Sequence, residues 1–390
     1  MKTPKYILPI IIISQFCCTS LWFAGNGVMN DLVINFNLSS NALGHLTSVV
    51  QFGFISGTLV FALFTIADRF SPSKVFFISA FLGAIFNALL TIENQTFLSL
   101  LFFRFFTGFF LAGIYPVGMK IATDYYDKGL GKSLGFLVGA LVLGTALPHL
   151  LKNIMQNFPW KSVIITTSFL SFLGGLLLVI IVKNGPYSIK SKELDLKACF
   201  SVFKNERFRK AAFGYFGHMW ELYTFWAFVP ILIQLYQNSH QNVNFNISLL
   251  SFCVISIGAL ACVLGGYLAE KYSTQKTAFS ALLLSCICCL CCPIIFFISS
   301  EILFIIFLVF WGMVVIADSP LFSTLVAQNA PSKNKGTALT IVNCIGFTIT
   351  IISLQAVTYL FDNINSYWIF LILAIGPIFG LLALKKSTLT

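Results

Sequence analysis

Twelve apolar segments, each about as long as a membrane-crossing helix, follow one another along this chain with only short polar stretches between them. A helix needs about 20 consecutive apolar residues to cross the roughly 30 Å hydrocarbon core of a bilayer. Because lipid offers no hydrogen-bond partners, the backbone groups of such a segment must be bonded within the helix itself. The sequence therefore predicts an all-α membrane protein with twelve transmembrane helices.

The expected spans form two sets of six on either side of a central polar interval. Those of the first half are 6–29, 42–67, 75–92, 97–120, 133–152 and 160–182, and those of the second are 211–236, 247–269, 277–298, 302–327, 337–361 and 366–384. Charged residues make up 9% of the chain, whereas about 25% is typical of soluble proteins. This composition excludes a soluble domain with polar surface helices.

The central interval carries eight Lys and Arg residues, at positions 183, 190, 192, 197, 204, 207, 209 and 210. Short loops rich in Lys and Arg stay on the cytoplasmic side of a membrane. With both termini also placed inside, the only cations outside are Lys152 and Lys161, while Arg104 lies within a span. We expect a six-helix bundle at 1–183, a cytoplasmic linker at 184–210 and a second bundle at 211–390, in a plasma membrane such as the bacterial inner membrane.

The net charge of +11 is explained by these loops, so nucleic acid is not an expected partner. Of the eleven cysteines, five lie in the apolar stretch 286–292. We interpret them as small apolar filler, because free Cys behaves as a small hydrophobe. Neither a disulfide framework, a metal site nor a cofactor is expected.

Two turns at equivalent places in the halves repeat a charge pattern. An acidic residue, a basic residue and a trailing lysine recur at an offset of 202 residues, as Asp68, Arg69 and Lys74 and as Glu270, Lys271 and Lys276. Such recurrence indicates a duplicated six-helix unit. The turns resemble the G-x-x-x-D-R-x-G-R-R/K loop motif of the major facilitator superfamily, with Gly266 at the first glycine position of the second copy but Phe64 at that position of the first.

Other segments extend the resemblance to essentially the whole chain. Arg104 and Gly108 resemble the R-x-x-x-G motif of the same family. The fifth span lacks the G-x-x-x-G-P pattern of its antiporters, because Ala140 follows Gly139. The stretches GHMWELY and ADSPLFS resemble bacterial members of unassigned substrate. The resemblance implies two six-helix bundles related by pseudo-twofold symmetry, with spans one, four, seven and ten lining a central cavity.

Charged residues within the spans are rare and therefore functional candidates, because each costs several kcal/mol to place in hydrocarbon. They are Arg104, Glu221 and Asp318, and all lie on expected cavity-lining spans. At 1.5 Å per residue both acids lie about 14–15 Å deep, and Arg104 about 10 Å. His218 precedes Glu221 by three residues and shares its helix face. We expect Glu221, His218 and Asp318 to carry protons, and Arg104 to bind solute or to exchange partners with an acid.

Two further sets of residues are expected to serve transport. The polar lining of the solute site is expected to include Gln15, Asn26, Tyr115, Trp220 and Asn343. The resemblance implies a cytoplasmic gate formed by Asp68, Arg69, Asp124, Glu270 and Lys271, in which Asp124 is a natural partner of Arg69.

The sequence favours a secondary transporter of a small organic solute, most simply a proton-coupled symporter acting as a monomer in the lipid bilayer. An intramembrane arginine suggests a solute with an anionic or zwitterionic group. The alternatives are a proton-coupled exporter of a siderophore or drug-like compound, a polytopic membrane enzyme such as an acyl or glycosyl transferase, and a non-transporting sensor. An enzyme would need acids or histidines near one membrane face, and no nucleotide-binding or hydrolase motif is present.

Overall fold

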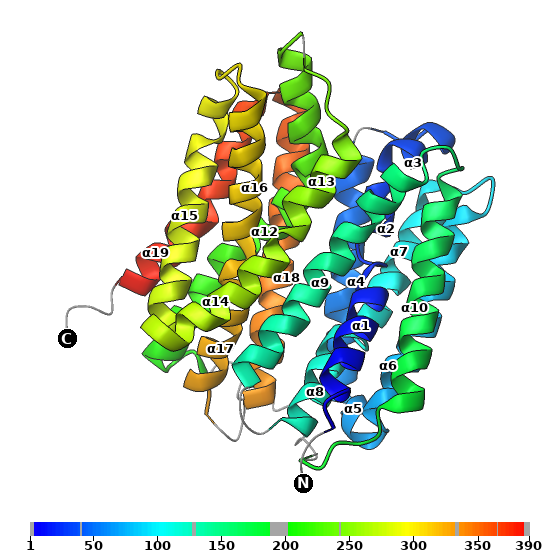
Figure 1. The fold of residues 1–390 in the computed structure, drawn as a ribbon, viewed down its shortest axis with the longest axis vertical. Coiled ribbons are helices and arrows are strands. Elements are labelled where there is room, and N and C mark those ends of the chain that lie inside the picture. Colours follow the sequence, from blue (N-terminus) through cyan, green and yellow to red (C-terminus); the bar gives the residue numbers. More distant parts are fainter. Residues whose placement is uncertain are drawn as a thin grey trace. The chain divides into compact units, whose positions relative to one another are not determined.

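The structure, a computed structural model, describes residues 4–39, 41–126, 130–187, 202–241, 243–331, 335–364 and 366–385. Every regular element within these ranges is a helix, as the apolar segments predict (Figure 1). Residues 188–201 of the basic interval, with Lys190, Lys192 and Lys197, lie outside the described residues.

The chain divides into two compact units, Met1–Leu194 and Asp195–Thr390. The helices of the first are α1 (Ile7–Thr19), α2 (Ala24–Gly27), α3 (Met29–Asn35), α4 (Ala42–Leu63), α5 (Ile66–Arg69), α6 (Pro72–Ala88), η1 (Leu89–Thr91), α7 (Phe97–Leu111), α8 (Tyr115–Tyr125), α9 (Leu130–Ile154) and α10 (Lys161–Ile181). Those of the second are α12 (Glu206–Ser239), α13 (Ile247–Ser256), α14 (Gly258–Tyr272), α15 (Thr274–Ile295), α16 (Glu301–Ala317), α17 (Ser319–Asn329), α18 (Lys335–Ile364), η3 (Tyr367–Ala374) and α19 (Ile375–Lys385).

Ten helices or joined helix pairs of the described ranges are long and apolar enough to cross a membrane. The interrupted first span and the more polar helix α12 complete the twelve expected spans. The expectation of one continuous first helix over 6–29 is wrong, because α1 ends at Thr19 and the chain turns before α2 and α3. The turn covers residues 20–23, and the short helix α2 that follows holds Gly25, Asn26 and Gly27, all poor helix formers.

The two units repeat one pattern of helix pairing. In each unit the first span packs on the fifth and sixth and the second on the fourth: α1 on α9 and α10 and α4 on α7 in the first unit, α12 on α18 and α19 and α13 and α14 on α16 in the second. A Cβ atom on Gly108 would lie 2.0 Å from the carbonyl oxygen of Val50. A Cβ on Gly312 would lie 1.9 Å from that of Val254. The close contact between glycine and valine in the first unit therefore recurs in the second unit at an offset of 204 residues.

The fourth span of each unit is interrupted at the same place. Helices α7 and α8 are separated just before Pro116, and α16 and α17 just before Pro320, again 204 residues apart. Proline favours the first turn of a helix and lacks the N–H that would continue the preceding one. In the second unit the residue at the interruption is Asp318.

The two repeat-related turns differ in backbone conformation. In the first copy α4 ends at Leu63, Thr65 is left-handed (φ 48°), and the short helix α5 follows. In the second copy α14 continues to Tyr272, and Ser273 adopts φ 138° and ψ 148°. Residue 273 holds the second glycine position of the loop motif, and only glycine adopts these angles without strain. The Ser273 Oγ atom accepts a hydrogen bond from the backbone N–H of Lys276 at 3.3 Å.

The Ser273→Gly substitution is expected to stabilise the protein. Relief of a strained backbone contributes about 1–3 kcal/mol, whereas exchanging serine for glycine at a helix N-cap costs only a few tenths. A net gain of about 1 kcal/mol should appear as a higher thermal midpoint of the purified protein in detergent. The matched control is Ser71→Gly at the equivalent position, where φ is −59° and glycine brings no relief. A lower midpoint for Ser273→Gly than for the wild type would contradict the argument.

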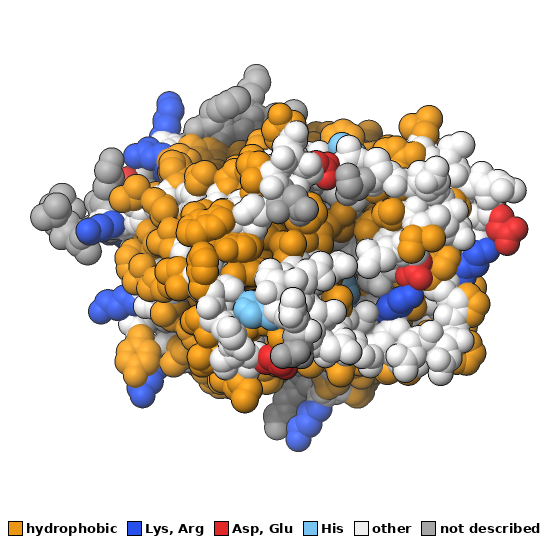
Figure 2. Space-filling model, turned by 90° about the horizontal axis from the view of Figure 1, so that it is seen from above, with side chains coloured by type: hydrophobic (Ala, Val, Ile, Leu, Met, Phe, Trp, Pro, Cys, Tyr) orange, Lys and Arg blue, Asp and Glu red, His pale blue; other side chains and the backbone are white. Residues whose placement is uncertain are grey.

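Large apolar side chains remain exposed along the helices, as expected for surfaces that face hydrocarbon rather than water. Helix α10, for example, exposes Ile165, Phe169, Leu173 and Ile180. Figure 2, which views the molecule from above Figure 1, shows hydrophobic side chains, other uncharged side chains and backbone over most of the visible face, with charged side chains scattered among them. The chain is accordingly an integral, multi-pass membrane protein.

Candidate functional site

A buried contact between a histidine and a carboxylate joins α12 to the junction of α16 and α17. Asp318 lies between α16 and α17, and its Oδ1 atom is 2.8 Å from Nδ1 of His218 on α12. Both side chains are only 1% exposed. Burying a carboxylate without a partner is costly, so the imidazole stabilises Asp318 at this buried position.

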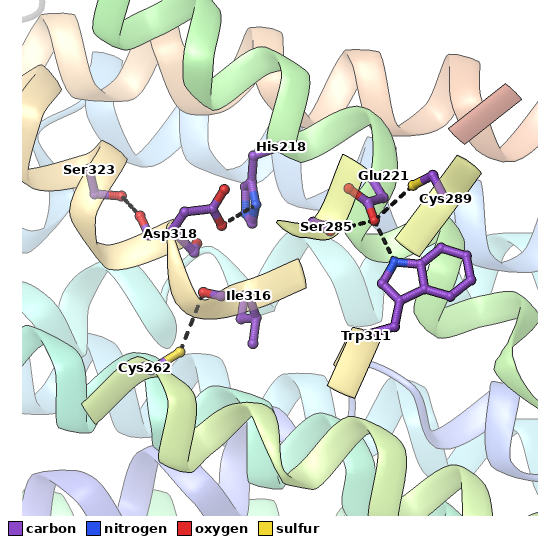
Figure 3. A network of polar contacts seen from close by, with 10 residues as sticks. His218, Glu221, Cys262, Ser285, Cys289, Trp311, Ile316, Asp318 and Ser323 are labelled. Atoms are coloured by element: carbon purple, nitrogen blue, oxygen red, sulfur yellow. Dashed lines mark hydrogen bonds and ion pairs between the residues drawn. The ribbon is translucent and has the colours of Figure 1, made fainter. Parts of the chain in front are cut away.

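Glu221 occupies a second polar site on the same helix. Its Oε1 atom accepts hydrogen bonds from Ser285 Oγ at 2.6 Å, Trp311 Nε1 at 2.6 Å and Cys289 Sγ at 3.1 Å (Figure 3). Ser285 and Cys289 are one turn apart on α15, and Trp311 lies on α16. All three donors are neutral, so the carboxyl group of Glu221 is held in place without a cation at Oε1.

His218 and Glu221, which share a helix face, do not bond to each other. The two residues share a helix and are three positions apart, but Figure 3 shows His218 pointing toward Asp318 and Glu221 toward α15 and α16. Within the described ranges the Nε2 atom of His218 is buried and has no hydrogen-bond partner. The structure therefore pairs His218 with Asp318 and holds Glu221 at a separate polar site one turn away on α12.

Arg104 lies in the first unit and forms a different kind of site. Its NH1 group donates to the carbonyl oxygen of Leu21 at 3.2 Å and to Oδ1 of Asn87 at 3.3 Å, and NH2 donates to the carbonyl oxygen of Trp22 at 2.6 Å. These two carbonyls belong to the turn between α1 and α2. The guanidinium therefore satisfies acceptors exposed by the interrupted first span. No acid forms an ion pair with Arg104 in the described part of the chain, and its expected role in solute binding or in an exchange of partners stays a prediction.

The residues expected to line the solute site fall into different surroundings. Gln15 on α1 is fully buried beside Gly118 of α8, and Nδ2 of Asn26 on α2 donates to Oγ1 of Thr47 at 2.8 Å. Trp220 instead donates from Nε1 to the carbonyl oxygen of Ile372 in η3 at 2.9 Å, an interaction that serves packing. The remaining two, Tyr115 at the start of α8 and Asn343 on α18, are half-buried.

Lys120, which sequence reasoning missed, is central to the charged cluster of the first unit. Its Nζ atom is 2.8 Å from Oδ1 of Asp68 and 3.8 Å from Oδ1 of Asp124. Asp124 thus shares Lys120 with Asp68, while Arg69 is exposed. The spacing of four residues between Lys120 and Asp124 on one helix was the available signal.

In the second copy of the turn, Glu270 is exposed. The Nζ atom of Lys271 lies 5.2 Å from the centre of the Tyr272 ring. The gate role of both remains a prediction.

Sequence reasoning also missed Ser285, Cys289 and Trp311, the three donors to Glu221. The cysteine-rich stretch was interpreted as apolar filler, and most of it is buried as such. Cys289 nevertheless directs its thiol to Glu221. A spacing of four residues places Ser285 and Cys289 on one face of a helix, but nothing in the sequence links that face to Glu221.

Comparisons with known proteins identify a family and a fold. The family model described as Major Facilitator Superfamily matches residues 11–354. A crystal structure of a bacterial homolog of the human lysosomal transporter Spinster, inward-facing and unoccupied, aligns with a TM-score of 0.71 at 14% identity, covering 98% of this chain and 97% of the other. The proton:xylose symporter XylE bound to 6-bromo-6-deoxy-D-glucose aligns with a TM-score of 0.73 at 12% identity, covering 98% and 95%. No curated protein matches the sequence.

Proposed function

This chain belongs to the Major Facilitator Superfamily, and on that basis we propose that it is a secondary transporter that imports a small organic solute together with protons. Transport would proceed by alternating access, in which a site at membrane depth opens first to one side and then to the other. The proposal assigns proton transfer to Asp318, His218 and Glu221. Solute movement driven by a gradient requires no covalent chemistry from the chain.

The buried pair of His218 and Asp318 carries the proposal. A paired imidazole and carboxylate form a site whose charge changes when a proton arrives or leaves. An uncompensated charge is costly within the membrane. A proton that neutralises this site therefore shifts the balance between the inward-open and outward-open states. Glu221 lies one turn from His218 on α12 and is held by three neutral donors on α15 and α16. It supplies a second acid that binds or releases a proton.

XylE, one of the similar structures, is named as a proton:xylose symporter. At 12% identity this likeness supports the fold alone, so the argument for proton coupling rests on the buried acids of this chain. The excess of Lys and Arg in the expected inner loops supports an orientation with both termini in the cytoplasm. We propose a plasma membrane location, such as the bacterial inner membrane, on the same basis.

The test is uptake of a pooled library of labelled metabolites into liposomes that contain the purified protein, with and without an inward proton gradient. The expected result is accumulation of at least one compound only when the gradient is present. Glu221→Gln preserves the size of the side chain but removes its titration, and is expected to abolish this accumulation. The matched control is Glu301→Gln, which alters an exposed carboxylate at the start of α16 and should leave accumulation unchanged.

Accumulation that needs an outward gradient would support the exporter alternative. Gradient-independent product formation from any compound would contradict transport and favour a membrane enzyme. Equal accumulation by wild type and Glu221→Gln would remove Glu221 from the proposed proton path.

A further inference from the structure

We infer that the solute is uncharged at neutral pH and carries several hydroxyl or amide groups, which neutral polar side chains of the first unit recognise. This inference rests on the proposed transport function. It differs from the sequence-based expectation of an anionic or zwitterionic solute, because the charged side chains within the spans already contact other protein groups.

The buried charges already have partners. Arg104 donates to two backbone carbonyl oxygens and to Asn87, and Asp318 contacts His218. One oxygen of Glu221 accepts three hydrogen bonds. A charged solute in a low-dielectric site needs an opposite charge that is available to it. An anion would have to compete with the backbone for Arg104. A cation at Asp318, whose Oδ2 atom is buried without a hydrogen-bond partner among the described residues, would have to share the carboxylate with His218.

Neutral polar groups of the first unit, by contrast, are buried without partners. Gln15, Gln51 and Thr145 are 0% exposed, and His149 is 3% exposed. Across the described residues, no protein group bonds to either polar atom of the two glutamine amides, to Thr145 Oγ1 or to His149 Nε2. Leaving a buried polar group unsatisfied costs about 1–3 kcal/mol, so a concentration of such groups indicates a ligand that pairs with them. We call these four residues the unpaired set.

The unpaired set surrounds the interrupted first span. On α4, Gln51 is one turn from Thr47, which bonds to Asn26, and the ring of Phe54 lies 4.8 Å from that of Trp22. Residues three and four apart share a helix face, so Gln51 lies on the face that α4 turns toward the first span.

Helix α9 approaches the first span from another direction. A Cβ on Gly144 would lie 2.1 Å from Thr19 Oγ1, and a Cβ on Gly27 would lie 2.7 Å from Cβ of Pro148. Thr145 and His149 each follow one of these contact residues directly and are four positions apart on one face of α9. Gln15 lies on α1 itself, where the missing side chain of Gly118 leaves room for its amide.

The chemistry of the unpaired set defines the kind of solute. Each amide has donors and an acceptor, a hydroxyl has both, and a neutral imidazole has one of each. None of these groups supplies a full charge while the imidazole is neutral. A solute with several hydroxyl or amide groups satisfies them, whereas an apolar compound leaves them unpaired. Buried polar groups that require a partner discriminate strongly against ligands that lack it.

A first experiment needs no solute. Gln51→Met removes an unpaired amide at nearly constant volume and is expected to raise the thermal midpoint of the solute-free protein by about 2 °C. Gln15→Met should act in the same direction. The control is Asn87→Leu, because Asn87 bonds to Arg104, Thr167 and Ser168 and its loss should lower the midpoint. A lower midpoint for both methionine variants would overturn the inference, since it would mean that the amides have partners in the solute-free protein.

The second experiment measures binding to the purified protein by thermal shift. It compares related compounds that differ in charge: glucose with glucuronate and glucosamine, and uridine with uridine monophosphate. Stabilisation by a neutral member alone, weakened roughly 3- to 10-fold in affinity by Gln51→Met, is the expected result. Preferential binding of an acid, an amine or a phosphate would overturn the inference. Neutral-solute binding that persists without proton-driven uptake would instead contradict the proposed symport and leave the solute class standing.

Discussion

Gly312→Ala is expected to leave little or no folded protein. The added Cβ atom would lie 1.9 Å from the carbonyl oxygen of Val254, and backbone on both sides prevents either helix from yielding locally. Overpacking in cores costs typically 1–3 kcal/mol even where side chains can move, so the cost here should be at least about 3 kcal/mol. The measurement is the fraction of detergent-extracted protein that elutes as a monodisperse species, followed by its thermal midpoint.

The first unit offers an equivalent substitution, and helix α14 offers a control substitution. Gly108→Ala should behave like Gly312→Ala, because its Cβ would lie 2.0 Å from the Val50 carbonyl oxygen. Gly266→Ala should be neutral or stabilising by up to about 1 kcal/mol, since a Cβ there meets no atom within 4 Å and alanine favours the helix. Wild-type yield and midpoint for Gly312→Ala would show that α13 and α16 are farther apart than described.

Asp318→Asn is expected to eliminate proton-driven accumulation while permitting solute exchange. With a gradient of about two pH units, coupling to one proton allows about 100-fold accumulation, because each unit corresponds to about 1.36 kcal/mol and a factor of ten. An asparagine cannot release a proton, so His218 loses its anionic partner and the ratio of internal to external solute should fall to about one. The measurement is steady-state accumulation of the solute identified by library uptake.

Exchange across the same liposomes separates coupling from folding. Counterflow of labelled against unlabelled solute requires no net proton movement, and Asp318→Asn should retain it. Loss of both activities in a protein with a wild-type thermal midpoint would place Asp318 in solute binding rather than in proton transfer. Undiminished accumulation would remove the pair of Asp318 and His218 from the mechanism.

Most of the fold was predictable because hydrophobic length is a local property. Each span of about 20 apolar residues is visible in the sequence, and the charges of the loops follow from the same topology. The interruption of the first span was not predicted. Its stability depends on Arg104, which is far along the chain and donates to Leu21 and Trp22. The apolar composition of residues 6–29 continues through the turn, so composition does not indicate where the helix ends.

The charged residues inside the spans could be identified from the sequence, but their partners and the neutral donors around Glu221 could not. Charge inside a span identifies Glu221, Asp318 and Arg104 because such charge is costly. Helix periodicity could show only that His218 and Glu221 share a face. The choice of Asp318 as the partner of His218, and of Trp311 as a donor to Glu221, depends on how α12 packs on α16 and α17.

The charged turns and the spans of the two units correspond at different offsets, and this difference shows where such a chain accepts insertions during evolution. The close approach of Gly113 to Phe61 corresponds at 204 residues to that of Gly265 and Ala317, whereas the charged turns correspond at 202. The first copy therefore holds two more residues between Phe61 and Asp68. Those residues are accommodated where Thr65 turns left-handed and α5 begins, at the end of a span. Inside a span, two extra residues would rotate every following side chain by more than half a turn and expose buried polar groups to lipid. Length variation among descendants of this gene should therefore concentrate at such turns.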